Sequence, residues 1–242
     1  MSYNLLLRKL SWIIACFIFL HPVIAEESFE FPMISEVLRK VLFPQGDGGS
    51  KYFRIPAIIT AKNGNLLAVI DARRNTTRDL QHTRNIDIAF KRSSDDGQTW
   101  SDIDFITNFP DGEVGSDASL VVERKTGKIL CFYNYLDHDT KFNKSRPSKT
   151  AVNYRYFLQT SDDHGETWSQ PRDIRDEILQ DHLTRRDFVF VTSGRGMQTK
   201  SGLIIHTLVH VGKAGYLFGS SDQGKTWGAL KKASPFSPAN ES

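Results

Sequence analysis

Arg54 is the first residue whose type and setting could do chemistry. It lies in the segment 52–56, of sequence YFRIP, between the apolar residues Phe53 and Ile55. Alternate side chains of a strand point to opposite faces, so the guanidinium is predicted to project away from these two neighbours. A planar guanidinium binds a carboxylate through two parallel hydrogen bonds, which a lysine ammonium does not reproduce. Arg54 is therefore a candidate carboxylate-binding residue, and the structural alternative is a surface ion pair at the end of a strand.

A second charged cluster follows in segment 71–79, of sequence DARRNTTRD. It contains two carboxyl groups, Asp71 and Asp79, and three arginines that include Arg73. A carboxyl group that burial or a neighbouring charge keeps protonated near the working pH can donate a proton to a departing oxygen. The segment therefore has the groups for general acid catalysis, but residue chemistry alone does not choose between the two aspartates.

The elements that must position these residues are marked by an internal repeat. Segments 93–100, 161–168 and 220–227 all fit the pattern S-x-D-x-G-x-T-W. The three tryptophans are 68 and 59 residues apart, intervals long enough for one small sheet each, as in a propeller. The repeat residues expected to be structural are Ser93, Asp95, Gly97, Thr99, Trp100, Ser161, Asp163, Gly165, Thr167, Trp168, Ser220, Asp222, Gly224, Thr226 and Trp227.

Each repeat follows an alternating apolar run (86–90, 154–158 and 216–219), which is where a strand should turn. The aspartate can accept backbone hydrogen bonds and the glycine can take a positive φ, while threonine and tryptophan begin the outgoing strand. We therefore interpret the repeats as hairpin corners. A calcium loop is the alternative, but the repeats lack the several oxygen ligands and the terminal glutamate of such a site, so no metal or cofactor is predicted.

Further strands are predicted at 37–43, 53–61, 66–72, 119–123, 129–135, 188–191 and 203–208. Glycine-containing turns at 62–65 and 125–128 join apolar runs as in an antiparallel meander, and no long helix interrupts the pattern. Many short strands in regular units predict an all-β fold, and among all-β folds a β-propeller.

Together these motifs resemble the sialidase family. The FRIP segment at 53–56 is similar to one that sialidases carry, and the three repeats are similar to what that family calls Asp boxes. The resemblance runs from about residue 37 to residue 242. It implies a six-bladed β-propeller that is incomplete here, with residues 37–242 forming the N-terminal part of the domain, roughly three to four blades.

The resemblance also implies roles for particular residues. Arg54 matches an arginine of the triad that clamps the substrate carboxylate. Asp79 matches the general acid, and Asp71 is then expected to pair with a neighbouring arginine. Arg73 matches an arginine that contacts the sugar, with a surface residue as the alternative. Asp117, in the segment SDAS at 116–119, matches an aspartate that hydrogen-bonds a sugar hydroxyl, with a turn residue before a strand as the alternative.

Glu241 matches the glutamate that acts as base for a tyrosine nucleophile, and a solvated tail residue is the alternative. Sialidases are known for using tyrosine where most glycosidases use a carboxylate. A carboxylate nucleophile would be repelled by the substrate's own carboxylate, whereas a phenol is neutral until a base removes its proton. The tyrosine and two further arginines of the family's clamp would lie beyond Ser242, so this chain is predicted to be a fragment or truncated product with weak activity or none.

The implied function is that of a retaining exo-α-sialidase, acting on sialylated glycoproteins, glycolipids or oligosaccharides. Two other functions stay open: a non-catalytic Asp-box propeller that binds sialylated glycans or protein, and a propeller glycosidase for neutral sugars. The pair of Arg54 and Asp79 separates these functions. A scaffold has no reason to keep both residues, and a neutral sugar needs no carboxylate clamp.

The first 25 residues have the features of a secretory signal peptide: Arg8 and Lys9, an apolar stretch at 10–20 and a cleavage pattern that ends at Ala25. The apolar run is shorter than the roughly 20 residues of a membrane-spanning helix. A lipid anchor at Cys16 is the alternative. We therefore predict a signal peptide at 1–25, a linker at 26–36, and a secreted, periplasmic or cell-surface protein with no transmembrane segment after cleavage.

Composition bears on partners and on disulfides. The net charge of +3 falls to +1 when Arg8 and Lys9 are removed, and no basic patch favours nucleic acid. Cys131 would be the single cysteine after loss of Cys16, so no intramolecular disulfide is predicted. Its apolar run, 129–133, favours a buried structural thiol.

Overall fold

The computed structural model describes residues 40–75, 77, 85–137, 154–179, 189–210 and 214–230. Lys40 belongs to one unit, Met1–Lys40, and every other described residue belongs to a second unit, Val41–Ser242. The described elements of this second unit are strands, apart from a 3-10 turn η1 (Asp47–Gly49) and the short helix α1 (Arg175–Ile178). Within the described ranges, no helix has the length and apolar character needed to cross a bilayer.

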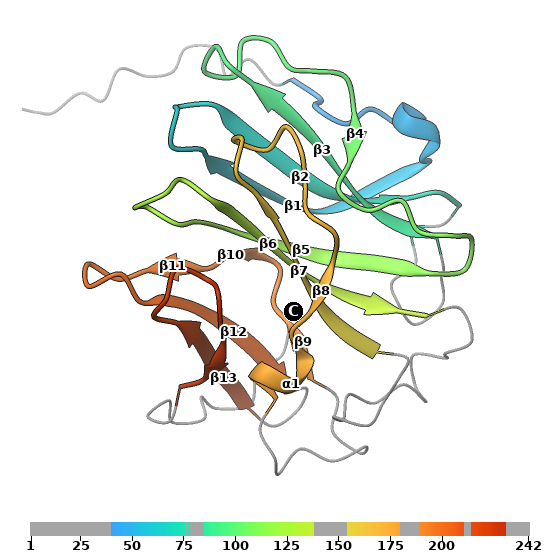
Figure 1. The fold of residues 1–242 in the computed structure, drawn as a ribbon. Helices are drawn as coiled ribbons and strands as arrows, with labels where there is room; N and C mark the ends of the chain where they lie inside the picture. Colours follow the sequence, from blue (N-terminus) through green and yellow to red (C-terminus); the bar gives the residue numbers. More distant parts are fainter. Residues whose placement is uncertain are drawn as a thin grey trace, which may run out of the picture. The chain divides into compact units, whose positions relative to one another are not determined.

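Two successive antiparallel meanders, which we call blades 1 and 2, contain the N-terminal strands (Figure 1). Blade 1 consists of β1 (Tyr52–Thr60), β2 (Leu66–Arg73), β3 (Ile86–Ser93) and β4 (Asp104–Phe105). Blade 2 repeats this order with β5 (Val114–Val122), β6 (Ile129–Leu136), β7 (Tyr154–Ser161) and β8 (Arg172–Asp173).

The third meander, blade 3, is drawn in orange to red in Figure 1. Its first strand is broken into β9 (Val189–Val191), β10 (Gly194–Arg195) and β11 (Met197–Gln198). These are followed by β12 (Ile204–His210), β13 (Ala214–Ser220) and β14 (Gly228–Ala229). The first strands of the blades are mutual neighbours, because β1 and β10 both contact β5, and β10 pairs with β5 in parallel. This is the arrangement of innermost strands in a propeller.

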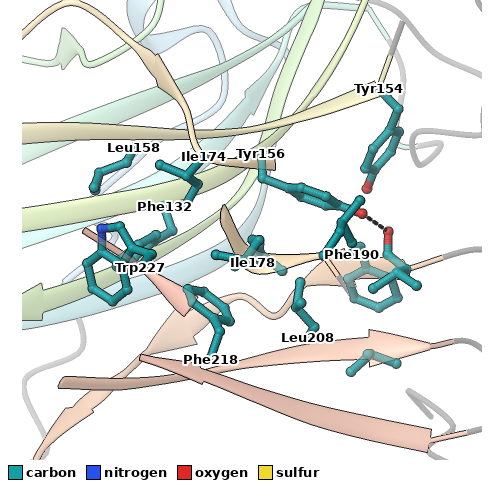
Figure 2. Packing of buried hydrophobic residues seen from close by; sticks show 14 of the residues in the cluster. Phe132, Tyr154, Tyr156, Leu158, Ile174, Ile178, Phe190, Leu208, Phe218 and Trp227 are labelled. Atoms are coloured by element: carbon teal, nitrogen blue, oxygen red, sulfur yellow. Dashed lines mark hydrogen bonds between the residues drawn. The ribbon is translucent and has the colours of Figure 1, made fainter. Parts of the chain in front are cut away.

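Apolar side chains fill the space between blades 2 and 3 (Figure 2). Phe132 of β6 meets Trp227 edge-on at 4.9 Å between ring centroids, and Phe218 of β13 packs against both rings. The hydroxyl of Tyr156 is buried here and donates a 2.8 Å hydrogen bond to the carbonyl of Val189. Each large apolar side chain buried in this way stabilises the fold by about 1.5–3 kcal/mol.

A second cluster joins blades 1 and 2. It includes Val69 and Ile88 from blade 1, and Leu120 and Tyr133 from blade 2. Cys131 is fully buried in the same cluster, and burial raises the pKa of its thiol well above the ordinary range. The apolar run around Cys131 predicted this location.

Several predicted strand boundaries are wrong. A strand was expected at 37–43, but Lys40–Phe43 of that range form no strand, and Val41 is 74% exposed. Residues 37–39 lie outside the described part of the chain. The strand expected at 119–123 begins at Val114. Its pairing with β6 shifts register between Ser116 and Ser119, and the residues on both sides of this shift belong to one strand. The predicted turns at 62–65 and 125–128 are present, with Gly64 and Gly127 at φ of 93° and 89°.

Candidate active site

Arg54 is aimed by a β-bulge in β1. Pairing with β2 is regular up to Arg54, which lies opposite Asp71, and resumes at Ala57 after a register shift. Within the bulge, Ile55 has a φ of 59°, a conformation that a β-branched residue rarely adopts and that costs of order 1–3 kcal/mol. Pro56 follows and has no N–H to donate to the ladder. The bulge leaves the Arg54 side chain exposed at the end of the strand.

Asp117 occupies the same kind of bulge in β5. Pairing with β6 is interrupted between Ser116 and Ser119, and Asp117 has a φ of 62°, close to that of Ile55. Its side chain is half-buried. Asp117 is therefore not a turn residue ahead of a strand, which was the structural alternative. The innermost strands of two successive blades each carry one predicted substrate-binding residue at or beside an equivalent distortion.

Arg73 reaches the same place from β2. Its guanidinium donates from Nη1 to the carbonyl oxygen of Thr77 at 3.2 Å, and Arg54 donates from Nη1 to that same oxygen at 3.4 Å. Arg73 is fully buried, so the alternative of an exposed surface residue is wrong. Arg74, one position on, points away and forms an ion pair with Asp87 at 3.0 Å. Successive side chains of a strand point to opposite faces, so Arg73 and Arg74 have different partners.

Asp71 links Arg73 to the neighbouring blade. Its Oδ2 receives hydrogen bonds from Arg73 Nη2 at 3.3 Å and from Ser116 Oγ at 2.5 Å, and its Oδ1 receives one from the backbone N–H of Asp117 at 3.0 Å. The predicted pairing of Asp71 with a neighbouring arginine is present. Complete burial raises the pKa of Asp71 to about 6, although these hydrogen bonds and the Arg73 charge act in the opposite direction.

Asn134 is a buried residue at this site that sequence reasoning missed. It lies in β6 opposite Ser116, and its Nδ2 donates to Asp117 Oδ2 at 3.2 Å. The same amide bonds to both the N–H and the carbonyl of Val191 in β9, at 2.9 and 3.0 Å. A polar amide inside the apolar run 129–135 was the one available signal.

The structure thus connects three of the predicted site residues, Arg54, Arg73 and Asp117, through Thr77 and Asp71. The two predicted catalytic residues, Asp79 and Glu241, lie outside the described residues. In the part of the chain that is described, no group of three or more His, Cys, Asp or Glu side chains could hold a metal ion.

The Asp boxes lie at turns and share one hydrogen-bond pattern. In the first box, Ser93 Oγ donates to Asp95 and accepts from the N–H of Gly97, and Asp95 accepts from both the N–H and the hydroxyl of Thr99. The second and third boxes repeat these bonds around Asp163 and Asp222.

The boxes also contact the preceding blade. An added Cβ at Gly165 of the second box would lie 3.3 Å from Leu67 of β2, and one at Gly224 of the third would lie 3.2 Å from Leu130 of β6. The glycines therefore permit both the positive φ of the turn and close packing between blades. The box contacts described above join residues other than Arg54, Arg73 and Asp117, which is consistent with an architectural role.

A groove of about 440 Å³ lies elsewhere, between the end of blade 1 and the second box. Its lining includes Phe105, Phe109, Glu166 and Trp168, and none of the predicted substrate-binding residues. The groove is therefore separate from the candidate active site.

Comparison with known proteins supports these motifs. A family model described as a BNR repeat-like domain matches residues 55–240. A sialidase of Bacteroides fragilis is 30% identical over 198 residues, which cover 75% of this chain and 35% of that protein. A sialidase of Micromonospora viridifaciens is 32% identical over 199 residues, covering 76% of this chain and 30% of that protein.

Solved structures of sialidases are also similar to this chain. A Hadza microbial sialidase matches with a TM-score of 0.66 at 28% identity, over 76% of this chain and 38% of that chain. The NanB sialidase from Streptococcus pneumoniae matches with a TM-score of 0.66 over 83% of this chain and 47% of that chain, and its 18% identity makes it evidence for the fold alone.

The chain spans about a third of the length of these two curated sialidases, 35% of the one from Bacteroides fragilis and 30% of the one from Micromonospora viridifaciens. The predicted fold class is confirmed, since the chain matches sialidase structures and its described strands form blades that do not close into a ring. The family predicted from the FRIP segment and the Asp boxes is confirmed as well: the chain belongs to the sialidase family and carries a BNR repeat-like domain over residues 55–240.

Proposed function

We propose that this chain holds part of the active site of an exo-α-sialidase, which hydrolyses terminal α-ketosidic sialic acid with retention of configuration. One observation carries the proposal: Arg54 and Arg73 donate to a single carbonyl oxygen, and Asp71 beside Arg73 accepts from the backbone N–H of Asp117 on the next blade. Guanidinium groups bind carboxylates through charge-assisted hydrogen bonds, so an anionic ligand suits this place. Sialic acid carries such an anion on its anomeric carbon.

The different settings of these residues suggest a division of roles. Arg54 is exposed, so its planar guanidinium is accessible for two parallel hydrogen bonds to the sugar carboxylate. Arg73 and Asp117 are held by buried partners, Asp71 and Asn134, and therefore present fixed donors and acceptors. We assign them to the hydroxyl groups of the sugar, where a fixed geometry discriminates between substrates.

The remaining roles rest on the family resemblance. Asp79 acts as the general acid and protonates the glycosidic oxygen as the aglycone departs. Glu241 removes the phenolic proton of a tyrosine, whose oxygen attacks the anomeric carbon. Water then releases the sugar, so that two displacements at one carbon give retention. This role is not assigned to any tyrosine of residues 1–242.

The proposed substrates are sialylated glycoproteins, glycolipids and oligosaccharides. We further propose a signal peptide at 1–25 and a linker at 26–36, which place the protein outside the cytoplasm, where such glycans occur. The relatives named sialidase from bacteria support the substrate class.

Titration of the purified chain with N-acetylneuraminic acid, followed by NMR, tests the binding part of the proposal. The chain is expected to bind N-acetylneuraminic acid and not the neutral sugar N-acetylglucosamine, and the Arg54→Ala variant is expected to lose that binding. Equal affinity for both sugars would contradict the proposal and favour a glycosidase for neutral sugars.

Hydrolysis of a fluorogenic sialoside tests the catalytic part. The Asp79→Asn substitution is made in a form of the protein that hydrolyses the fluorogenic sialoside. It is expected to abolish this hydrolysis and to preserve binding of N-acetylneuraminic acid. An unchanged rate would contradict the assignment of Asp79 as general acid. Binding without any hydrolysis by the full-length protein would favour the non-catalytic alternative.

A further inference from the structure

The contacts of Asp71 cross the boundary between two blades. Asp71 lies on β2 of blade 1, whereas Ser116 and Asp117, which donate to its two oxygens, lie on β5 of blade 2. The oxygen that accepts from Ser116 also accepts from Arg73 at 3.3 Å. One carboxylate is therefore the common acceptor for a buried arginine and for a bulge on the next blade.

Arg73 and the bulge at Asp117 each need the contact with Asp71. Arg73 is fully buried, and a guanidinium charge in that setting is strongly destabilising without a carboxylate beside it. The positive φ of Asp117 is a conformation that persists only where surrounding contacts hold it. Asp71 bonds to its N–H and Asn134 bonds to its carboxylate, so the backbone and the side chain of Asp117 are fixed from two directions.

We propose that Asp71 is a positioning residue, which sets the Arg73 guanidinium and the Asp117 bulge at a fixed separation so that both reach one bound sugar. The inference rests on the proposed function, and it adds a residue that touches no substrate. It predicts that sugar affinity depends on a carboxylate at position 71 even when the blade remains folded.

Asp87 supplies a matched control. It is a buried aspartate on the adjacent strand β3, and it accepts hydrogen bonds from Arg74 at 3.0 Å, from the backbone N–H of Phe109 at 3.0 Å and from the Thr107 hydroxyl at 3.4 Å. Its partners are thus an arginine, a backbone amide and a hydroxyl, as at Asp71, but none is a predicted site residue. A loss that came only from removing a buried carboxylate would appear in both variants.

The test compares Asp71→Asn with Asp87→Asn in the full chain. Thermal unfolding is expected to show a lowered Tm for both variants. The affinity for N-acetylneuraminic acid, measured by NMR titration below both melting temperatures, is expected to fall about tenfold or more in Asp71→Asn and by less than about twofold in Asp87→Asn.

A double-mutant cycle separates positioning from general loosening. If Asp71 acts through Asp117, Asp71→Asn should weaken binding much less in an Asp117→Ala background than in the unchanged chain. The inference would be overturned if Asp71→Asn weakened sugar binding by the same factor in both backgrounds, or if Asp71→Asn bound the sugar as tightly as the unchanged chain. Either result would leave the proposed function standing. Failure of the unchanged chain to bind the sugar would overturn the proposed function and this inference with it.

Discussion

Arg54 and Arg73 donate hydrogen bonds from adjacent strands to the same backbone carbonyl oxygen, that of Thr77, at 3.4 and 3.2 Å. The two guanidinium groups differ in setting, because Arg54 is exposed and Arg73 is buried beside Asp71. The Asp71 carboxylate holds the Arg73 guanidinium in one geometry, whereas the exposed Arg54 guanidinium can bind the carboxylate of a ligand. In the proposed function, Arg54 therefore binds the carboxylate of the sugar, and Arg73 discriminates between sugars through their hydroxyl groups.

Arg54→Lys is expected to weaken binding of N-acetylneuraminic acid at least about tenfold, because an ammonium cannot form two parallel hydrogen bonds to a carboxylate. The Tm should change little, since the side chain is exposed. Isothermal titration calorimetry measures the affinity. Arg92→Lys is the control and should bind as the unchanged chain does, because Arg92 lies near the C-terminal end of β3 and pairs with Glu166. Undiminished affinity of the Arg54 variant would contradict the assigned role.

Asn134→Ala is expected to lower the free energy of unfolding by about 2–4 kcal/mol, because it leaves the buried N–H and carbonyl of Val191 without their amide partner. Urea unfolding measures this change. Asn108→Ala removes an exposed amide and should stay within about 0.5 kcal/mol of the unchanged chain. A similarly small effect at Asn134 would show that the contact between blades 2 and 3 is not needed.

Asp95→Asn is expected to reduce the acid sensitivity of the fold. Hydrogen bonds from the hydroxyl and the N–H of Thr99 lower the pKa of Asp95 to about 2. Since the unfolded value is about 3.9, the stabilisation is complete above about pH 4 and is lost as the pH falls through the folded pKa. Urea unfolding between about pH 4 and pH 2 should therefore show a weaker pH dependence in the variant. Asp102→Asn, an exposed aspartate beyond the turn, is the comparison.

Asp71 should show the opposite pH dependence. Burial raises its pKa to about 6, so the folded chain holds this proton more tightly than the unfolded chain does. Its contribution to stability is complete below about pH 4 and declines as the pH rises through the folded pKa. The difference in unfolding free energy between the unchanged chain and Asp71→Asn should therefore fall from about pH 4 to pH 6. A difference that rises over this range would contradict the assigned burial.

The sequence by itself determined the blade unit and the family. An Asp box is a local structure, since the bonds of Asp95 and Ser93 join residues no more than four positions apart. Turn chemistry of this kind depends on a few residue types at fixed spacing, so it can be read without knowledge of distant contacts. The alternation of apolar residues likewise predicted most strands, because a side-chain period of two is a local property.

Only the tertiary structure decided how the site is held together. Nothing near Ile55 predicts a positive φ, because a β-branched side chain disfavours it locally. Asp71 meets Ser116 across 45 residues, and Asn134 meets Val191 across 57. Local patterns indicate which face of a strand a residue occupies, but its partner on that face comes from another blade. Packing between blades therefore determines that Asp71 contacts Ser116 and that Asn134 contacts Val191.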